Sequence, residues 1–232
     1  MKLISNKWLL GAALLFSTQF VQAQDWANLK RYQKDNAELP APAANETRVV
    51  FMGNSITEGW RNSSPEFFKS NNYVGRGISG QTTPQMLIRF HQDVVALNPK
   101  VVVMLCGIND IAGNTGPSTL EMIENNIAAM AEIARANKIR VVLSSVLPAF
   151  DFPWKPGLEP ANKVIDLNKW LKEYADSHKL TYLDYHTAMK DERNGLPANL
   201  AKDGIHPTKE GYAIMEPMVK AAIAKALKQK IK

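Results

Sequence analysis

Five short runs of apolar residues recur along the chain, and most of them are continuous rather than alternating with polar positions. Turn residues close each run, and segments with apolar positions at helical spacing lie between the runs. Continuous apolar runs of this length are typical of strands in a parallel sheet that helices cover on both faces. The pattern therefore predicts an α/β sandwich whose strands are residues 48–52, 73–78, 101–105, 140–146 and 180–183.

The helical segments carry their own start and stop signals. Pro84 suits the first turn of a helix, and Ser118 and Glu121 have the spacing of a capping box. Pro217 falls inside the last helical segment and predicts a kink there. The predicted helices are residues 25–39, 65–69, 84–96, 118–137, 160–177 and 208–228.

The first 23 residues have the pattern of a secretory signal peptide. Lys2 and Lys7 form a basic start, a mostly apolar stretch follows, and small residues precede a cleavage point after Ala23. An uncleaved membrane anchor is the alternative, but the apolar stretch is short and polar residues interrupt it. We therefore expect export to the periplasm or the exterior, without a stable membrane anchor. The predicted segments are a signal peptide at 1–23, a leader helix and connector at 24–47, and one domain at 48–232.

Composition and charge exclude some classes of partner. With 45% hydrophobic and 22% charged residues, the chain has the composition of a globular protein. Much of its net charge of +6 lies in the last helix, where lysines suit the helix C-terminus, and basic residues do not interleave with aromatic ones. We expect no nucleic-acid partner. Cys106 is the single cysteine, so no intrachain disulfide is possible, and its apolar neighbours predict a small buried residue.

Three candidate chemical groups lie just past predicted strands, namely Ser55, Gly80 and Asn109. Parallel strands end at one edge of a sheet, so these turns should converge there. A buried strand that ends in a glycine turn and then presents a serine is a common way to hold a nucleophile. Gly53-Asn54-Ser55 is also ordinary loop chemistry when taken alone.

A serine hydroxyl needs a base, because it stays protonated at neutral pH. His206 precedes Pro207, where the last helix is expected to begin, and Asp203 lies three residues earlier across a glycine. The Asp203 carboxylate would turn back to the His206 imidazole, although an isolated pair of this kind is more often a capped loop. His91 and His178 are expected to be surface or packing residues.

Acyl transfer also needs donors aimed at the oxyanion that develops during the reaction. The Gly80 N–H suits this role because a glycine lets the backbone approach closely, and the Asn109 side-chain amide supplies a second donor. Each turn is equally compatible with a plain strand-to-loop connection. An aromatic, proline-rich loop at residues 151–156 would wall the same edge of the sheet.

Taken in order, these turns resemble the four signature blocks of the SGNH hydrolases, also called the GDSL esterase/lipase family. The resemblance covers the chain from about Arg48 to its C-terminus. The matching blocks are Gly53-Asn54-Ser55-Ile56-Thr57, Gly77-Ile78-Ser79-Gly80-Gln81-Thr82-Thr83, Gly107-Ile108-Asn109-Asp110 and Asp203-Gly204-Ile205-His206-Pro207.

The resemblance implies a three-layer α/β/α sandwich with a flavodoxin-like, five-stranded parallel sheet. It implies Ser55 as nucleophile, His206 as general base and then acid, and Asp203 as the residue that orients His206. The N–H groups of Ser55 and Gly80 and the Asn109 side chain would form the oxyanion hole. No metal and no organic cofactor are implied. Asn54 stands where the family's name motif has aspartate.

Two other functions are compatible with parts of the sequence. Asp184, His186, Asp203 and His206 could serve as metal ligands in a metallohydrolase, but Ser55 would then have no role. A carbohydrate-binding protein on the same fold would not need the serine, the aspartate and the histidine together.

The favoured function is an exported serine esterase that hydrolyses short-chain carboxylic esters through an acyl-enzyme. The expected substrate is a small-molecule or glycan ester, most of all an acetylated carbohydrate. The alternative is a lysophospholipase-like or thioesterase activity on lipid acyl groups. The sequence does not predict the oligomeric state.

Overall fold

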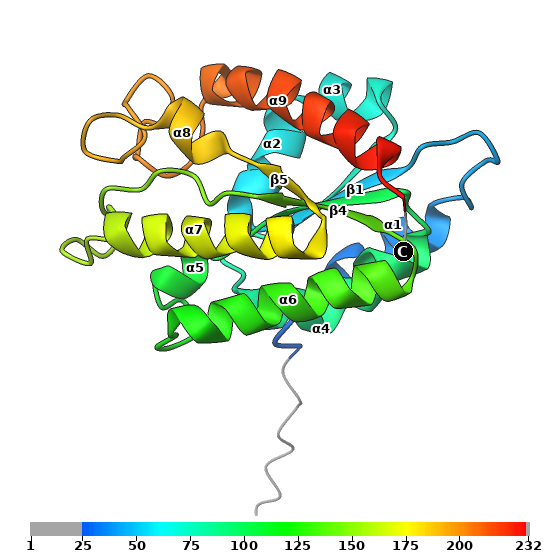
Figure 1. The fold of residues 1–232 in the computed structure, drawn as a ribbon, viewed down its shortest axis with the longest axis horizontal. Coiled ribbons are helices and arrows are strands. Elements are labelled where there is room, and N and C mark those ends of the chain that lie inside the picture. The colour runs from blue at the N-terminus through cyan, green and yellow to red at the C-terminus, as the bar shows by residue number, and fades with distance from the viewer. Residues whose placement is uncertain (1–24, 231–232) are drawn as a thin grey trace, which may run out of the picture.

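The computed structural model describes residues 25–230, and the predicted signal peptide lies outside them. Within these residues, five parallel strands form one sheet in the order β2-β1-β3-β4-β5. Helices cover both faces of the sheet (Figure 1), so the predicted three-layer α/β/α sandwich is confirmed. The strands are β1 (Val49–Gly53), β2 (Tyr73–Gly77), β3 (Val101–Leu105), β4 (Arg140–Ser144) and β5 (Thr181–Leu183).

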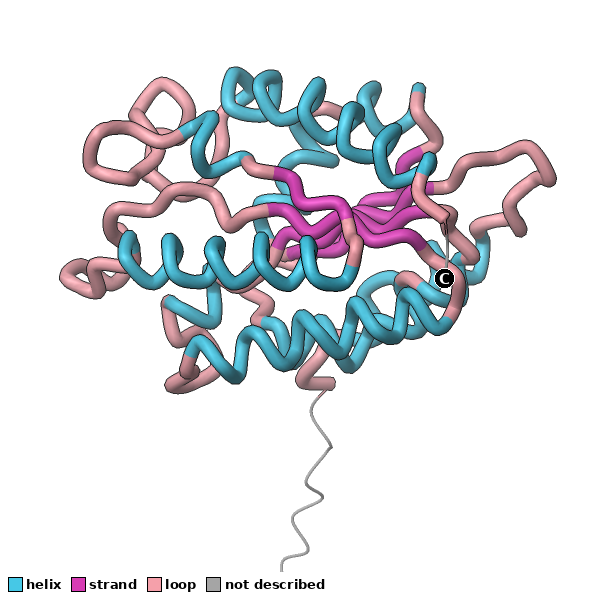
Figure 2. The backbone as a smooth tube through the Cα atoms, viewed as in Figure 1, coloured by secondary structure: helices cyan, strands magenta, loops and turns pink. Residues whose placement is uncertain are grey.

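Two helical layers enclose the sheet (Figure 2). One layer contains α2 (Ser55–Ser63), α3 (Pro65–Ser70), α8 (Tyr185–Met189) and α9 (Lys209–Lys228). The other contains α4 (Thr83–Asp93), α5 (Ile108–Ile111), α6 (Leu120–Ala136) and α7 (Ala161–His178), and a 3₁₀ turn at Val95–Leu97 follows α4. Among residues 25–230, the helices fall short of the length and apolar character that a bilayer-spanning segment requires.

The strand order determines where in the fold the candidate site lies. The chain enters the sheet at β1, moves outward to β2, and then crosses back to β3 on the other side of β1. Connections therefore diverge from the C-terminal ends of β1 and β3, and such switch points form crevices in open α/β sheets. Ser55 follows β1 and Asn109 follows β3, so both candidate residues lie at this point.

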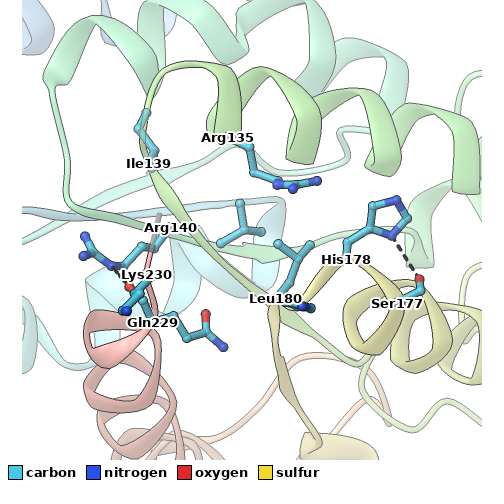
Figure 3. A pocket seen from close by; sticks show the side chains of 10 residues that line it. Arg135, Ile139, Arg140, Ser177, His178, Leu180, Gln229 and Lys230 are labelled. Carbon is cyan, nitrogen blue, oxygen red and sulfur yellow. Dashed lines mark hydrogen bonds between the residues drawn. The ribbon is translucent and has the colours of Figure 1, made fainter. Parts of the chain in front are cut away.

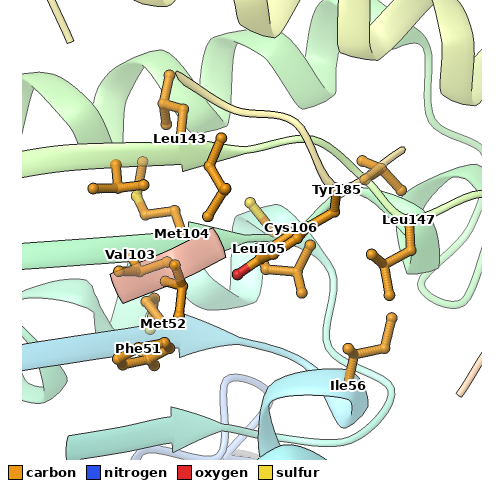
Figure 4. Packing of buried hydrophobic residues seen from close by; sticks show 14 of the residues in the cluster. Phe51, Met52, Ile56, Val103, Met104, Leu105, Cys106, Leu143, Leu147 and Tyr185 are labelled. Atoms are coloured by element: carbon orange, nitrogen blue, oxygen red, sulfur yellow. The ribbon is translucent and has the colours of Figure 1, made fainter. Parts of the chain in front are cut away.

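The core explains why the strands are continuously apolar. Every residue of β1 and β3 is buried, because helices pack against both faces of these central strands. Figure 4 shows side chains of β1, β3 and β4 packed together near the strand ends, with Cys106 among them. The prediction that Cys106 is a buried core residue is confirmed, and burial raises the pKa of its thiol.

The leader differs from the single predicted helix at 25–39. It forms a 3₁₀ turn, η1 (Leu29–Tyr32), followed by the short helix α1 (Gln33–Glu38). Asn28 adopts a left-handed backbone conformation with φ 54°, so no regular helix can run through it. The Asp25 carboxylate instead accepts hydrogen bonds from the N–H groups of Leu29 and Lys30 at 2.7 and 3.0 Å.

Several other boundaries shift for local reasons. Strand β4 ends at Ser144 rather than at residue 146, because the Val146 N–H turns to the Asn168 side chain at 2.7 Å. Helix α6 begins at Leu120, two residues after the predicted start at Ser118, and Thr119 rather than Ser118 caps it. Helix α9 begins at Lys209 rather than at Pro207, with Thr208 as its cap.

Three short helices were not predicted, namely α2, α5 and α8. Each begins within three residues of a strand end, so no loop sequence separates it from the strand. Helix α2 is held by α9, which lies in the same layer, because the Tyr212 hydroxyl donates to the Ile56 carbonyl at 2.8 Å. This bond holds the first turn of α2, which begins at Ser55.

Candidate active site

Ser55 lies at a close-packed strand-to-helix turn. A Cβ atom on Gly53 would lie 2.0 Å from Thr57 Oγ1, and one on Gly77 would lie 2.3 Å from the Glu58 nitrogen. Both glycines are therefore required for the first turn of α2 to sit against the ends of β1 and β2. Asn54 caps the helix, since its Oδ1 accepts the Ile56 N–H at 3.1 Å. The turn leaves the Ser55 side chain partly exposed.

The structure brings Ser55, His206 and Asp203 together from two distant parts of the chain. Ser55 Oγ lies 2.9 Å from His206 Nε2, and His206 Nδ1 lies 2.6 Å from Asp203 Oδ2. Asp203 accepts at the second ring nitrogen, so Nδ1 carries the proton and Nε2 is free to accept the serine proton. The arrangement is a continuous path for proton transfer from the hydroxyl to the imidazole.

The loop that carries Asp203 also sets its charge. Its other oxygen, Oδ1, accepts the backbone N–H groups of His206 and Ile205 at 2.8 and 3.0 Å. Burial by itself raises the pKa of this carboxyl, but the hydrogen bonds from His206 and Ile205 outweigh burial, so the pKa lies below its usual range. Asp203 is therefore an anion at neutral pH and holds the His206 ring in one orientation.

The predicted oxyanion donors lie on two turns that contact each other. Asn109 is buried, and its Nδ2 donates one hydrogen to the Gln81 carbonyl at 2.9 Å, which leaves the second amide hydrogen available. Gly80 has φ 77°, a conformation that a side chain would strain. Within residues 25–230, the N–H groups of Ser55 and Gly80 donate to no protein acceptor.

A buried polar network supports these turns, and the sequence pattern did not reveal it. The Arg89 side chain is fully buried and donates to the Gly53 carbonyl at 2.9 Å, to Gln81 Oε1 at 2.5 Å and to Asp93 at 3.0 Å. Burial lowers the pKa of Arg89, and the charge of Asp93 opposes that shift. Arg89 and Asp93 lie four residues apart on α4, next to the apolar Met86 and Phe90, and this spacing is the one signal that could have identified the pair.

A second carboxylate lies directly behind Asn109. Asp110 is buried and accepts both the Thr83 N–H, at 3.0 Å, and the Thr83 hydroxyl, at 2.6 Å. Burial raises the pKa of Asp110 to about 6 although these hydrogen bonds favour the ionised form. The contact joins α5 to the start of α4 and so fixes the Asn109 turn against the Gly80 turn.

The residues of the metal-site alternative have other partners. Asp184 caps α8, with Oδ1 accepting the Thr187 N–H at 3.0 Å and Oδ2 the Thr187 hydroxyl at 2.7 Å. His186 is buried in α8, where burial lowers its pKa. In the part of the chain that the structure describes, no three His, Cys, Asp or Glu side chains gather as a metal-binding group. His91 is exposed on α4, and His178 stacks on Tyr174 with ring centroids 4.0 Å apart.

The loop at residues 151–156 lies against the candidate site, as predicted. The indole of Trp154 is half exposed, and its centroid is 6.2 Å from that of the His206 ring. The loop is anchored from below, because Phe152 is fully buried against Trp154 and Lys155 Nζ donates to the Ala112 carbonyl at 3.1 Å. A cavity of about 250 Å³ between this loop and Asp203 extends the site on the same side.

A separate cavity of about 440 Å³ lies near the N-terminal ends of β4 and β5, where α6, α7 and α9 end (Figure 3). Its lining is basic, with Arg135, Arg140, Lys179 and Lys230. Helix C-termini carry partial negative charge, so cations are expected at this end of the fold without any ligand. The cavity is remote from Ser55, which follows the other end of β1.

Comparison with known proteins agrees with this geometry. A model of the GDSL-like Lipase/Acylhydrolase family matches residues 51–214. The chain is 50% identical to a protein from Bacteroides fragilis assigned as an acylhydrolase, with a TM-score of 0.87 over 88% of this chain and 100% of that one. It is also 50% identical to a GDSL-like lipase from Bacteroides thetaiotaomicron, with a TM-score of 0.84 over 86% of this chain and 98% of that one.

A curated relative is an acetylxylan esterase from Xylanibacter ruminicola. It is 27% identical over 222 residues, which cover 80% of this chain and 45% of the relative. The chain thus spans less than half the length of that enzyme. The family match includes Ser55, Gly80, Asn109, Asp203 and His206, and it confirms the ester-hydrolase class at the level of the family. The fold, the arrangement of these residues and the family match together show that the chain belongs to the GDSL-like lipase/acylhydrolase family.

Proposed function

We propose that the protein is an exported serine esterase that removes short acyl groups, above all acetyl, from carbohydrate. The observation that carries the mechanism is the pair of contacts at His206, 2.9 Å from Ser55 Oγ and 2.6 Å from Asp203 Oδ2. A serine, an imidazole and a carboxylate in this geometry form a nucleophile, its base and the group that orients the base.

The first half of the reaction forms an acyl-enzyme. Ser55 Oγ attacks the ester carbonyl carbon while His206 Nε2 takes the hydroxyl proton, and Asp203 stabilises the imidazolium. The carbonyl oxygen becomes an oxyanion that the Ser55 N–H, the Gly80 N–H and the Asn109 amide bind. The carbon–oxygen bond to the alcohol then breaks, and the imidazolium gives its proton to the departing oxygen.

The second half releases the acid. His206 takes a proton from a water molecule, whose oxygen attacks the acyl carbon, and the same three donors bind the second oxyanion. The bond to Ser55 Oγ breaks, and the proton returns to the serine from the imidazolium. No electrons are exchanged with another reactant, so the groups present are sufficient for the chemistry.

The choice of a carbohydrate rests on where the alcohol must lie. The departing oxygen receives its proton from His206, so the alcohol portion of the substrate lies beside that ring. The half-exposed indole of Trp154 lies beside His206. It offers an apolar ring face that is open to solvent, and a sugar ring can pack on such a face while its hydroxyl groups stay hydrated. The similarity to an acetylxylan esterase supports the same class of substrate.

Hydrolysis of p-nitrophenyl esters from acetyl to decanoyl tests this proposal, with Ser55→Ala and an EDTA-treated sample alongside. We expect the acetyl ester to turn over fastest, the activity to be unaffected by EDTA, and Ser55→Ala to lose at least about 10³-fold in kcat. A preference for long chains would favour the lipid alternative. Full activity in Ser55→Ala would overturn the serine mechanism.

Export is tested separately, by expressing the full chain in a Gram-negative host and separating the periplasm from the cytoplasm. We expect the periplasmic protein to begin at Gln24, as measured by intact mass. Protein found only in the cytoplasm with Met1 retained would contradict export.

A further inference from the structure

An open cavity of about 340 Å³ lies between the leader segment, residues 25–38, and the Gly80 turn; we call it the leader cavity. Gly80 lines it, so it adjoins the position assigned above to the oxyanion. The rest of its wall is mostly polar around Trp26, and its residues are Asp25, Trp26, Asn28, Ile78, Ser79, Gln81, Gln85, Asn114 and Thr115. The leader lies outside residues 51–214, so the cavity depends on residues beyond the match to the family.

The leader is held in place at the cavity, so the cavity is preformed. Gln85 Nε2 donates to the Trp26 carbonyl at 2.6 Å, and Gln81 Nε2 donates to the Ala27 carbonyl at 2.7 Å. Asn114 Nδ2 donates to the Gly80 carbonyl at 3.2 Å on the opposite wall. These bonds fix the backbone on both sides of the cavity and reduce the ordering cost of binding a ligand.

The Trp26 side chain is the large aromatic group of the cavity wall, and the protein covers only about half of it. Its indole is 46% exposed, although its backbone is held on both sides. A large aromatic side chain on a polar, preformed wall is typical of a binding site, where the ring packs on the ligand and polar groups orient it.

The wall chemistry selects the class of ligand. Amide and hydroxyl groups predominate around one indole, which suits a ligand with an apolar face and hydroxyl edges. A sugar ring has both. A fatty acyl chain would leave the amide and hydroxyl groups desolvated without partners, which costs free energy.

We infer that the leader cavity binds a sugar residue next to the one that carries the ester, so that the enzyme acts on oligosaccharides rather than on single sugars. The inference rests on the proposed esterase function. Trp154 lies beside His206 and the leader cavity includes Gly80, and both His206 and Gly80 are assigned above to the reaction at Ser55, so the two sites adjoin the same reacting group.

The kinetic test compares Trp26→Ala with the matched control Leu29→Ala, which removes another part-exposed apolar side chain from the same leader but not from the cavity. The substrates are p-nitrophenyl acetate, which has no sugar, and acetylated xylotetraose. In Trp26→Ala we expect the ratio of kcat/KM values, oligosaccharide over p-nitrophenyl acetate, to fall about tenfold through KM. The ratio should be unchanged in Leu29→Ala and partly restored in Trp26→Phe. An unchanged ratio in Trp26→Ala would overturn the inference.

A binding measurement separates this inference from the esterase proposal. Unsubstituted xylotetraose, cellotetraose and chitotetraose are titrated into wild type, Trp26→Ala and Leu29→Ala, with calorimetry as the readout. We expect at least one of them to bind wild type and Leu29→Ala equally and Trp26→Ala about tenfold more weakly. No binding of any of the three, or equal binding to Trp26→Ala, would overturn the sugar site even if the esterase is active. Binding lost in Trp26→Ala alone would support the site even if Ser55→Ala retained full activity.

Discussion

Arg89 donates from Nη2 to the carbonyl oxygen of Gly53 across 2.9 Å, in a region where neither residue is exposed to solvent. Gly53 is the last residue of β1 and stands two positions before Ser55. The same guanidinium binds Gln81, whose neighbour Gly80 is a proposed oxyanion donor. One buried cation therefore fixes the serine turn and the Gly80 turn relative to each other.

Removal of this cation should destabilise the fold, because Asp93 would remain buried without its partner. We expect Arg89→Met to lower the free energy of unfolding by about 3 kcal/mol or more. The double variant Arg89→Met, Asp93→Leu should be less destabilised than the single one, since no charge is left unpaired. Urea unfolding of the three proteins measures this, and additive losses in the double variant would contradict it.

Two glycines of β2 should differ sharply in their tolerance of alanine. A Cβ on Gly77 would meet the backbone of α2, with the Glu58 nitrogen at 2.3 Å, whereas one on Gly75 would meet the flexible Arg61 side chain at 2.9 Å. We expect Gly77→Ala to cost about 2 kcal/mol or more and to lower kcat by displacing Ser55. Gly75→Ala is the control, and equal melting temperatures for the two variants would refute the steric argument.

Asp203→Asn should lower activity far more than stability. The amide oxygen can still accept the two backbone N–H groups, which turns the NH₂ group toward His206 Nδ1. A donor at that position no longer holds the proton on Nδ1, and a neutral amide cannot stabilise the imidazolium. We expect kcat on p-nitrophenyl acetate to fall by about 10³-fold or more. Thermal unfolding serves as the control, since a comparable loss of structure would give the result another cause.

Asp110 should make the stability of the protein depend on pH. Its pKa in the folded state is about 6, above the ordinary value of 3.8, so between these values the folded protein binds more protons than the unfolded chain. The contribution of this group to stability is therefore present below about pH 4 and is lost as pH rises through 6.

The variant Asp110→Asn tests the sign of that dependence. Asparagine does not titrate, so the stability of the variant relative to wild type should improve from pH 4 to pH 7, by a difference on the order of 3 kcal/mol. Urea unfolding at several pH values measures it. A relative stability that worsens with rising pH would reverse the assignment for Asp110.

Asn54 stands where the family's name motif has aspartate, and its capping bond to the Ile56 N–H explains what the position requires. We expect Asn54→Ala to lose about 1 kcal/mol through the missing cap. Asn54→Asp keeps an oxygen at the same place and adds a negative charge at the helix N-terminus, so it should be more stable than Asn54→Ala and retain activity. Equal stabilities for the two variants would contradict the capping role.

Local patterns along the chain were sufficient to predict the sheet and the order in which the candidate site residues follow its strands. Continuous apolar runs can only be buried on both faces, which requires parallel strands between helices, and all five predicted strands are present. Parallel strands end at one edge, so the turns bearing Ser55, Gly80 and Asn109 were expected to meet there. Local patterns carry this information because period and turn chemistry act over a few residues.

Which polar side chains are buried, and how the leader packs, depended on contacts between residues far apart in the chain. The four-residue spacing of Arg89 and Asp93 is equally common in ion pairs on exposed helix faces, and the burial of Arg89 depends on acceptors at Gly53, Gln81 and Asp93, two of them outside α4. The leader helix was predicted from spacing, but Asn28 takes a left-handed conformation, and Gln85 and Gln81 hold the Trp26 and Ala27 carbonyls beside the Gly80 turn. A buried polar group is stable only where all of its partners meet, and that requirement involves residues far apart in the chain.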